Sequence, residues 1–270
     1  MKILVFIIIL IVLGGGFMIL KNNSHDSSVD SVADKGSAVS DVTTSGKALS
    51  VIADEVAYAG TVKGLFARPE APGVYPGVVM IHEWWGLNEN IKTMARTLAS
   101  EGYEVLAVDL YDGKVATTAE EARALVGAVE KEKAVKNLKS AVEYLRKNGA
   151  PKIASLGWCF GGGQSLQLAL SGEKLDATVI YYGTLVTDKS QLSKISFPVL
   201  GIFGGKDTSI PTSTVNTFRD TLTSLGVKNS VTIYPDVGHA FANPSGANYA
   251  PDETRDAWNK TLTFLSENLK

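Results

Sequence analysis

Cysteine is almost absent from this sequence, since a single thiol, Cys159, occurs among its 270 residues. One cysteine excludes an intramolecular disulfide and a zinc cluster built on thiolates. We therefore expect neither a metal nor any other cofactor. Cys159 has to be explained by packing in the interior or by its own reactivity.

An excess of charge of either sign is also lacking. The sequence contains 26 Lys and Arg and 28 Asp and Glu residues, a formal net charge of −2. Without a basic face or an acidic tail, the sequence has no signature of a nucleic-acid partner. Hydrophobic residues make up 45% and charged residues 20%, which is typical of a globular protein. No internal repeat is present, and the length favours one large α/β domain over two.

Long hydrophobic runs are confined to residues 1–20. Residues 3–20 are apolar apart from glycines and follow only Met1 and Lys2. At about 1.5 Å per residue, a helix of this length reaches roughly 27 Å, nearly the thickness of the bilayer core. We therefore predict a membrane anchor or a signal peptide. Small residues suited to cleavage, 31–33, lie well beyond the run, which favours an anchor and leaves a cleaved signal open.

Residues 21–48 are rich in Ser, Asp, Asn, Gly and Thr and contain no aromatic residue. Such a segment cannot bury enough apolar surface to offset the entropy of ordering it. We expect a flexible polar linker here and a folded domain at residues 49–270. The positive charge of Lys2 before the apolar run predicts that the domain is extracytoplasmic, held at the membrane or secreted after cleavage. We expect it to be a monomer.

From residue 49 onward, apolar strand patterns alternate with helical ones. Strands are expected at 51–59, 61–68, 77–81, 103–108, 152–156, 178–182, 198–203 and 231–234. Helices are expected near 91–98, 118–145, 160–170 and 257–265, with one helix or two open for 118–145. Asn88 is expected to cap the first helix, and Thr118 with Glu121 forms a capping box. This alternation predicts a mostly parallel sheet with helices on both faces, after an antiparallel hairpin, and ligands at the carboxyl ends of the strands.

A glycine-flanked cysteine, in Gly157-Trp158-Cys159-Phe160-Gly161, joins an expected strand to an expected helix. G-x-C-x-G is the cysteine form of the nucleophile elbow, in which glycines permit a sharp strand-to-helix turn. A thiol at a helix N-terminus lies near unpaired N–H groups that favour a thiolate and a developing oxyanion. The alternative is a buried structural cysteine in a glycine-rich turn.

A nucleophile at an elbow needs a histidine as its base and an acidic residue that orients this histidine. In α/β-hydrolase folds the acidic residue follows the nucleophile in the sequence, and the histidine comes last. Only one histidine, His239, comes after Cys159, in the loop that follows the last expected strand. Asp207 follows the preceding expected strand and is the predicted acid. Asp236 is too close to His239 in sequence to face its ring easily, and Asp109 precedes the elbow and is expected to cap a turn.

The loop after the third main strand, residues 82–88, reads H-E-W-W-G-L-N. In this fold the loop supplies one N–H of the oxyanion hole, and the residue after the nucleophile supplies the other. These backbone donors would belong to Trp84 and Phe160. Trp85 is predicted to contact substrate as a pocket wall, with plain core packing as the alternative. His82 is expected to be a packed histidine at a strand end.

Four motifs in order resemble the dienelactone hydrolase family. They are Glu83 in H-E-W-W-G-L-N, Cys159 in G-W-C-F-G-G, Asp207 in G-G-K-D and His239 in G-H-A-F. The resemblance covers residues 49–270 and supports the α/β-hydrolase fold. It implies that Cys159 attacks an ester or lactone carbonyl, and that His239 and Asp207 complete a catalytic triad. It also implies that Glu83 accepts a hydrogen bond from the resting thiol and keeps it neutral.

One position differs from the family pattern. Members of the family hold a substrate carboxylate with arginines, one of which follows the histidine shortly, whereas this chain has Asn243 there. We predict that Asn243 takes part in substrate binding. The resemblance implies a small-molecule ester or lactone as the substrate class and leaves the particular substrate open.

Two classes of function remain. The first is a hydrolase of carboxylic esters, lactones or thioesters that forms an acyl-enzyme on Cys159. The second is a catalytically idle relative that binds a small molecule or senses oxidants with that thiol. The complete set of Cys159, His239, Asp207 and Glu83 favours the enzyme. Peptidase activity is less favoured, because nothing in the sequence marks a peptide-binding insert.

Overall fold

The computed structural model describes residues 48–270. The predicted anchor or signal at 1–20, and all but the last residue of the predicted linker at 21–48, lie outside the described residues. Within 48–270, no helix is both long enough and apolar enough to span a membrane.

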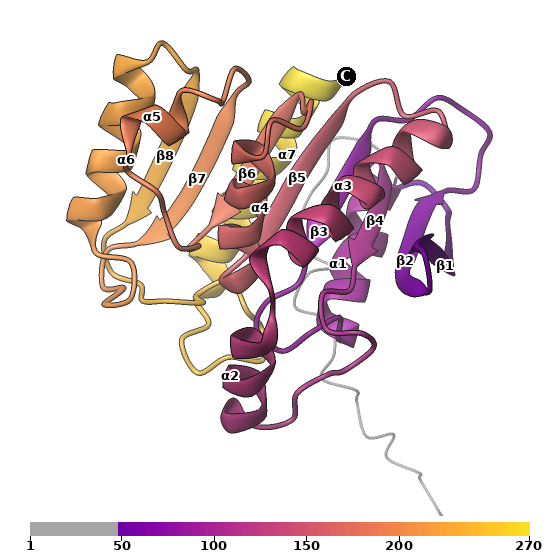
Figure 1. Ribbon diagram of the computed structural model, residues 1–270, viewed down its shortest axis with the longest axis horizontal. Coiled ribbons are helices and arrows are strands. Elements are labelled where there is room, and N and C mark those ends of the chain that lie inside the picture. The colour runs from indigo at the N-terminus through magenta and orange to yellow at the C-terminus, as the bar shows by residue number, and fades with distance from the viewer. Residues whose placement is uncertain (1–47) are drawn as a thin grey trace, which may run out of the picture. The chain divides into compact units, whose positions relative to one another are not determined.

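Eight strands of the described chain form one sheet in the order β1-β2-β4-β3-β5-β6-β7-β8 (Figure 1). They are β1 (Val51–Ala59), β2 (Val62–Pro69), β3 (Gly77–Ile81), β4 (Glu104–Val108), β5 (Ile153–Trp158), β6 (Ala177–Tyr181), β7 (Val199–Gly204) and β8 (Asn229–Tyr234). β2 is antiparallel to both β1 and β4, and all other neighbours are parallel. The predicted N-terminal hairpin and the mostly parallel sheet are confirmed.

Helices cover both faces of this sheet. They are α1 (Glu89–Ser100), α2 (Ala119–Ala128), α3 (Lys131–Lys147), α4 (Phe160–Leu170), α5 (Lys189–Leu192), α6 (Thr212–Ser224) and α7 (Pro251–Leu269). Figure 1 shows α3 and α4 in front of the sheet and α1 and α7 behind it. The predicted layering is therefore confirmed.

Side chains of the central strand β3 alternate between two cores. Val78 and Met80 belong to the core that includes buried residues of α1 and α7, whereas Val79 and Ile81 belong to the core under α3. All five residues of β3 are buried. Because successive side chains of a strand point to opposite faces, a strand covered on both sides appears in the sequence as a continuous apolar run.

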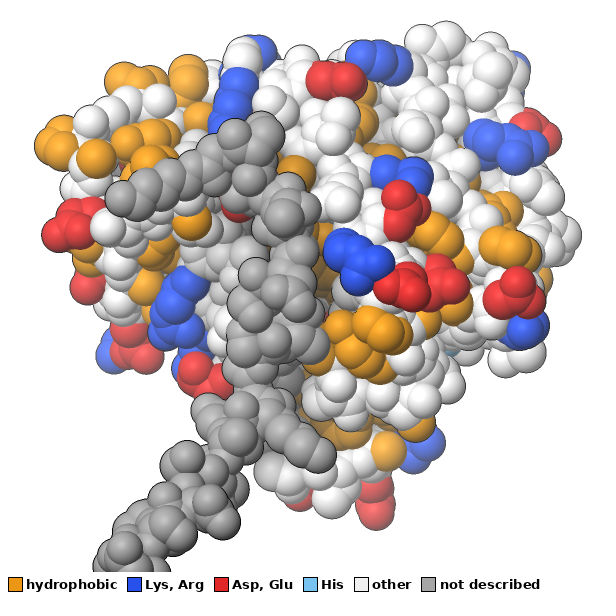
Figure 2. All heavy atoms as spheres, turned by 180° about the vertical axis from the view of Figure 1, so that it is seen from behind, with side chains coloured by type: hydrophobic (Ala, Val, Ile, Leu, Met, Phe, Trp, Pro, Cys, Tyr) orange, Lys and Arg blue, Asp and Glu red, His pale blue; other side chains and the backbone are white. Residues whose placement is uncertain are grey.

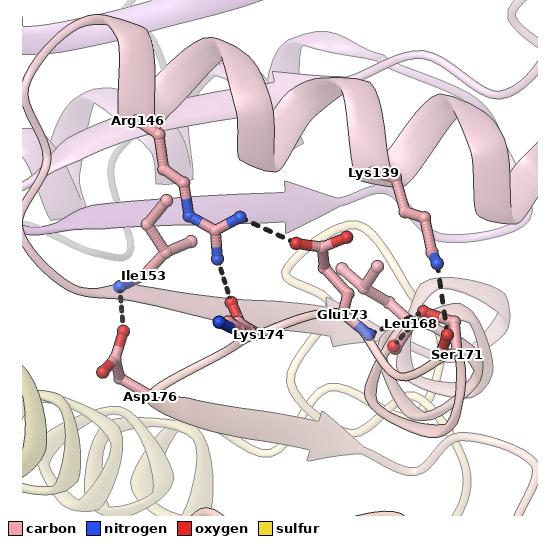
Figure 3. A network of polar contacts seen from close by, with 8 residues as sticks. All are labelled: Lys139, Arg146, Ile153, Leu168, Ser171, Glu173, Lys174 and Asp176. Carbon is pink, nitrogen blue, oxygen red and sulfur yellow. Dashed lines mark hydrogen bonds and ion pairs between the residues drawn. The ribbon is translucent and has the colours of Figure 1, made fainter.

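A polar network holds the connection between α4 and β6 against α3 (Figure 3). Arg146 of α3 forms an ion pair with Glu173, at 2.8 Å from Nη1 to Oε1, and also donates to the carbonyl oxygen of Lys174. The Asp176 carboxylate accepts a hydrogen bond from the backbone N–H of Ile153 at 2.7 Å. Since α4 follows β5 directly, these contacts fix the far ends of the two elements that position Cys159.

Charges of both signs are interspersed on the face opposite to that of Figure 1. Figure 2 shows Lys and Arg side chains next to Asp and Glu side chains there, with hydrophobic side chains between them. Neither sign gathers into a large patch on the described part of this face.

Most differences from the sequence predictions concern element boundaries. Residues 118–145 form two helices, α2 and α3, because Val129 and Glu130 between them have extended backbone. The capping box of Thr118 with Glu121 and the Asn88 cap are both confirmed. α7 begins six residues before the expected helix, with a proline in its first turn, and β8 begins two residues early. α5 and α6 were not predicted.

Candidate active site

Cys159 lies on a sharp turn between β5 and α4. Its backbone has a φ of 54° and a ψ of −117°, a conformation that is strained for a residue with a side chain. A Cβ on Gly157 would lie 2.1 Å from the carbonyl oxygen of Gly161, and one on Gly161 would lie 2.3 Å from that of Ile81. Only glycine fits at these two positions. The thiol is consequently half-buried at the N-terminus of α4, as the elbow pattern predicts.

His239 joins Cys159 to Asp207. Its Nε2 is 3.1 Å from the Cys159 Sγ, and its Nδ1 is 2.7 Å from Oδ2 of Asp207. The other oxygen of the Asp207 carboxylate accepts hydrogen bonds from the N–H groups of Ser209 and Ile210, at 2.7 and 3.0 Å. These bonds hold the carboxylate in place, so that it can orient the imidazole. Loops after β5, β7 and β8 thus bring the three groups together in the predicted order.

The two other aspartates considered for this role do not reach the histidine. Asp236 is exposed and forms an ion pair with Lys206 at 3.1 Å. Asp109 is buried, and its carboxylate accepts hydrogen bonds from the N–H groups of Tyr111 and Gly113. It caps the turn after β4, as expected.

Electrostatics in the site favour a protonated imidazole. Burial lowers the pKa of His239, but its hydrogen bonds to Asp207 and Cys159 outweigh burial and raise this pKa to about 10. Burial raises the pKa of Asp207, but hydrogen bonds from His239 and from backbone N–H groups keep it below its usual value. The imidazole of His239 can therefore take the thiol proton on Nε2, and the imidazolium that forms lies between the Asp207 carboxylate and the sulfur.

The predicted oxyanion donors lie where the elbow meets the end of β3. A Cβ on Gly161 would also lie 2.4 Å from the carbonyl oxygen of His82, so the first turn of α4 packs directly on this loop. Phe160 is the first residue of α4, and its N–H is among those that the helix leaves unpaired. Trp84 lies in the adjoining loop. Their roles as donors to an oxyanion stay predictions.

Glu83 is buried and lies in a different arrangement from the one that the family resemblance implies. Its Oε2 accepts a hydrogen bond from Nδ2 of Asn243 at 2.6 Å, while Oε1 is buried without a partner. The Cys159 thiol contacts His239 instead of Glu83. Burial raises the pKa of Glu83 to about 7, although His239, Tyr182 and Asn243 each lower it. The expected hydrogen bond from the resting thiol to Glu83 is therefore not formed.

Asn243 lies within the site, and its predicted role in substrate binding stays a prediction. The side chain is buried, and its Oδ1 accepts hydrogen bonds from the N–H and hydroxyl of Ser245, at 3.0 and 2.8 Å. The Nδ2 of Asn243 donates to Glu83, and its Oδ1 accepts from Ser245. The side chain therefore connects Glu83 to the turn at residues 243–245.

His82 is a packed histidine, as expected. It is fully buried, and its Nε2 accepts a hydrogen bond from the N–H of Leu110 at 3.2 Å. Its Nδ1 must then carry the proton and donate to the carbonyl oxygen of Glu83, 2.5 Å away. Burial lowers the pKa of His82, which agrees with a neutral ring. His82 thus ties the loop that carries Glu83 to the loop after β4.

Trp84 and Trp85 are half-buried, with ring centroids 4.9 Å apart. The guanidinium of Arg123 from α2 lies over the Trp84 ring at 5.9 Å. A contact of Trp85 with substrate stays a prediction.

A cavity of about 750 Å³, lined by residues that include Leu65, Leu87 and Asp109, does not border Cys159 and is not the candidate substrate site.

Tyr182 is the residue of the site that the sequence analysis missed. It is fully buried at the end of β6, has a φ of 34°, and packs edge-on against the His239 ring at 5.3 Å. Its hydroxyl lies near enough to Glu83 to lower that pKa, yet forms no aligned hydrogen bond. The sequence signal that could have identified Tyr182 was its position directly after an expected strand, at the edge of the sheet that carries Cys159.

Within residues 48–270, no cluster of three potential metal ligands occurs.

A cysteine on a strand-turn-helix elbow, with a histidine and an aspartate on later loops of a mostly parallel sheet, defines the α/β-hydrolase class. Comparison with known proteins narrows this class. Residues 62–269 match the model of the dienelactone hydrolase family, and the chain belongs to that family.

Individual relatives agree with this placement. The "Putative carboxymethylenebutenolidase" of Salmonella typhimurium is 33% identical over 219 residues, covering 75% of this chain and 81% of the relative. A protein of the same name from Saccharolobus solfataricus is 32% identical over 247 residues, covering 76% and 93%. A crystal structure described as a putative dienelactone hydrolase from Klebsiella pneumoniae superposes with a TM-score of 0.74 at 28% identity, covering 81% of this chain and 99% of that one. These relatives support hydrolysis as the reaction class.

Proposed function

We propose that this chain hydrolyses carboxylic esters, lactones or thioesters through an acyl-enzyme on Cys159. One observation carries the proposal: His239 lies between the Cys159 thiol and the Asp207 carboxylate, at 3.1 and 2.7 Å. A nucleophile, a base within hydrogen-bond reach and a group that orients the base are the parts that acyl transfer requires. Membership of a hydrolase family supports the same reaction class.

In the first half of the reaction, the Cys159 sulfur attacks the carbonyl carbon while the thiol proton passes to Nε2 of His239. The oxyanion that forms is stabilised by the N–H groups of Phe160 and Trp84. When the intermediate collapses, the bond to the leaving oxygen or sulfur breaks, and the imidazolium returns its proton to that atom. The product is a thioester of Cys159.

The second half of the reaction uses the same groups. His239 takes a proton from a water molecule, whose oxygen attacks the thioester carbonyl. Collapse of this intermediate releases the carboxylic acid and regenerates the thiol, which recovers its proton from His239. Asp207 keeps the imidazole oriented in both halves.

The test is turnover of a panel of activated esters and thioesters by purified variants. Cys159→Ala and His239→Ala are each expected to lower kcat by at least about 10³-fold, because the two groups act as a unit. Asp207→Ala should also lower kcat strongly, whereas the matched control Asp236→Ala should not, since that carboxylate pairs with Lys206 at the surface. Retention of most activity by Cys159→Ala would contradict the mechanism, and an inactive wild type would favour the idle or redox-sensing relative.

We also propose that the chain works outside the cytoplasm, held to the membrane by residues 3–20 or released from it by cleavage. The support is the apolar composition of that segment.

A further inference from the structure

The turn after β3 fixes the peptide group that joins Glu83 to Trp84. The Glu83 carbonyl oxygen accepts two hydrogen bonds, from Nδ1–H of His82 at 2.5 Å and from the N–H of Gly86 at 3.3 Å. Nδ1 of His82 carries the proton because Nε2 accepts from the N–H of Leu110. Two donors therefore set the direction of this carbonyl.

The direction of the Trp84 N–H follows from that of the Glu83 carbonyl. A peptide bond is planar and trans, so the C=O and the N–H of one peptide group point in opposite directions. Since the carbonyl points to the His82 ring, the Trp84 N–H points away from that ring. Among residues 48–270, no group accepts a hydrogen bond from this N–H. It is therefore free to donate to a ligand.

His82 also contacts the segment that carries the other predicted oxyanion donor. Its ring stacks on that of Phe160, with centroids 5.8 Å apart and an angle of 24° between the planes. The same ring packs edge-on against Tyr111 at 4.6 Å and is fully buried. A buried ring packed against two others cannot turn freely, so it is a rigid anchor for the Glu83 carbonyl.

The other hydrogen bonds of this turn act on different peptide groups. The Tyr111 hydroxyl donates to the carbonyl of Trp84 at 3.2 Å, and the N–H of Ala116 donates to that of Trp85 at 2.9 Å. The N–H groups that share these two peptide groups belong to Trp85 and Gly86. His82 is thus the side chain that acts directly on the peptide group of the Trp84 N–H.

We propose that His82 is a positioning residue, which aims the Trp84 N–H at the oxyanion of acyl transfer by holding the Glu83 carbonyl. This inference rests on the proposed function, because an oxyanion forms only if Cys159 attacks a carbonyl group. His82 itself does not touch the substrate. A donor that is oriented before the reaction stabilises the oxyanion without having to be reoriented.

The test compares His82→Asn with His82→Leu, two replacements of nearly equal shape, in the full-length chain. The amide N–H of Asn lies close to the position of Nδ1 and can keep the bond to Glu83, whereas Leu has no donor. Both lose the bond from Leu110 and the aromatic ring. For an activated ester, we expect a kcat about 30-fold lower in His82→Leu than in His82→Asn, with KM within about threefold.

Alkylation by iodoacetamide separates an effect on the oxyanion from an effect on the thiol. The sulfur of Cys159, the only cysteine of the chain, displaces iodide from a saturated carbon, and no oxyanion forms. The alkylation rate should therefore be equal in His82→Asn and His82→Leu. If alkylation falls in parallel with kcat, His82 acts on the thiol, and the proposal is overturned.

A purely structural role predicts a different order of activities. His82→Asn buries a carbonyl oxygen without a partner, so it should be no more stable to urea than His82→Leu. Activity that followed stability would then be no higher in His82→Asn. Equal loss of kcat in both variants, or no loss in either, overturns the proposal. If His82→Leu does not fold, His82→Gln replaces it, because its amide lies near the position of Nε2 and not of Nδ1.

Tyr111→Phe is the matched control. It removes the hydrogen bond to the next peptide group and keeps the ring beside His82, so kcat should stay within about twofold of wild type. A loss as large as that of His82→Leu would assign the effect to the whole turn and overturn the proposal. A wild type that iodoacetamide alkylates but no ester acylates would refute the proposed function, and this inference with it. An active wild type with equal kcat in both His82 variants would refute this inference alone.

Discussion

At the residue scale, Glu83 makes the stability of the protein depend on pH. Its pKa is about 7 in the folded protein, against an ordinary value of 4.5, because it is buried. The folded state then binds the proton more tightly than the unfolded state does. The contribution of Glu83 to the free energy of unfolding is therefore expected to fall as pH rises from 4.5 to about 7, by an amount on the order of 3 kcal/mol, and to stay lower above that range.

Glu83→Gln is expected to remove most of this fall. Between pH 5 and pH 8, urea unfolding of the variant should show a smaller loss of free energy than wild type does. The stability that the raised pKa of His239 contributes is lost in both proteins as pH rises from about 6.5 toward 10, so the difference between the two proteins below about pH 6.5 reports on Glu83. The exposed Glu70→Gln serves as the control and should follow wild type. Parallel profiles for wild type and Glu83→Gln would refute the pH dependence assigned to this carboxyl.

At the element scale, the elbow depends on the close contact between α4 and β3. Gly161→Ala would place a methyl group 2.3 Å from the carbonyl oxygen of Ile81, and neither backbone can move without disturbing the sheet. We expect a loss of several kcal/mol of stability, or failure to fold. Gly127→Ala is the matched control: it lies in α2 with open space around it and should stabilise the protein by about 0.5 to 1 kcal/mol. Urea unfolding of both variants tests this, and a well-folded Gly161→Ala would show that the contact is not required.

The elements that were predicted best are those with strong local signals. β3 is a run of five apolar residues, and the Thr118 capping box marks the start of α2 through bonds between near neighbours. α6 was missed because Ser and Thr fill its exposed positions and mask the helical spacing of Val215, Phe218 and Leu222. The division between α2 and α3 depends on two residues with extended backbone, for which no Gly or Pro gives a signal.

At the scale of the whole molecule, the open prediction concerns residues 3–20. The full-length chain should sediment with membranes and resist extraction by high salt, since the attachment would depend on apolar burial and not on charge. Mass spectrometry of the N-terminus separates the two alternatives. An intact Met1 supports an anchor, whereas a chain that begins at Asp34 shows a cleaved signal. A full-length chain that stays in the supernatant at low salt would contradict the anchor.

The sequence by itself determined the identities and the order of the groups that carry the proposed chemistry. Cys159 is the only thiol and His239 the only later histidine, and the pattern of apolar runs predicts that their loops meet at the carboxyl edge of a parallel sheet. The tertiary structure decided which partner each group has. Glu83 and Asn243 are 160 residues apart, and Tyr182 directly follows another strand, β6. Which of several nearby hydrogen bonds forms depends on side-chain orientations and burial, and these are set only when the loops pack against one another.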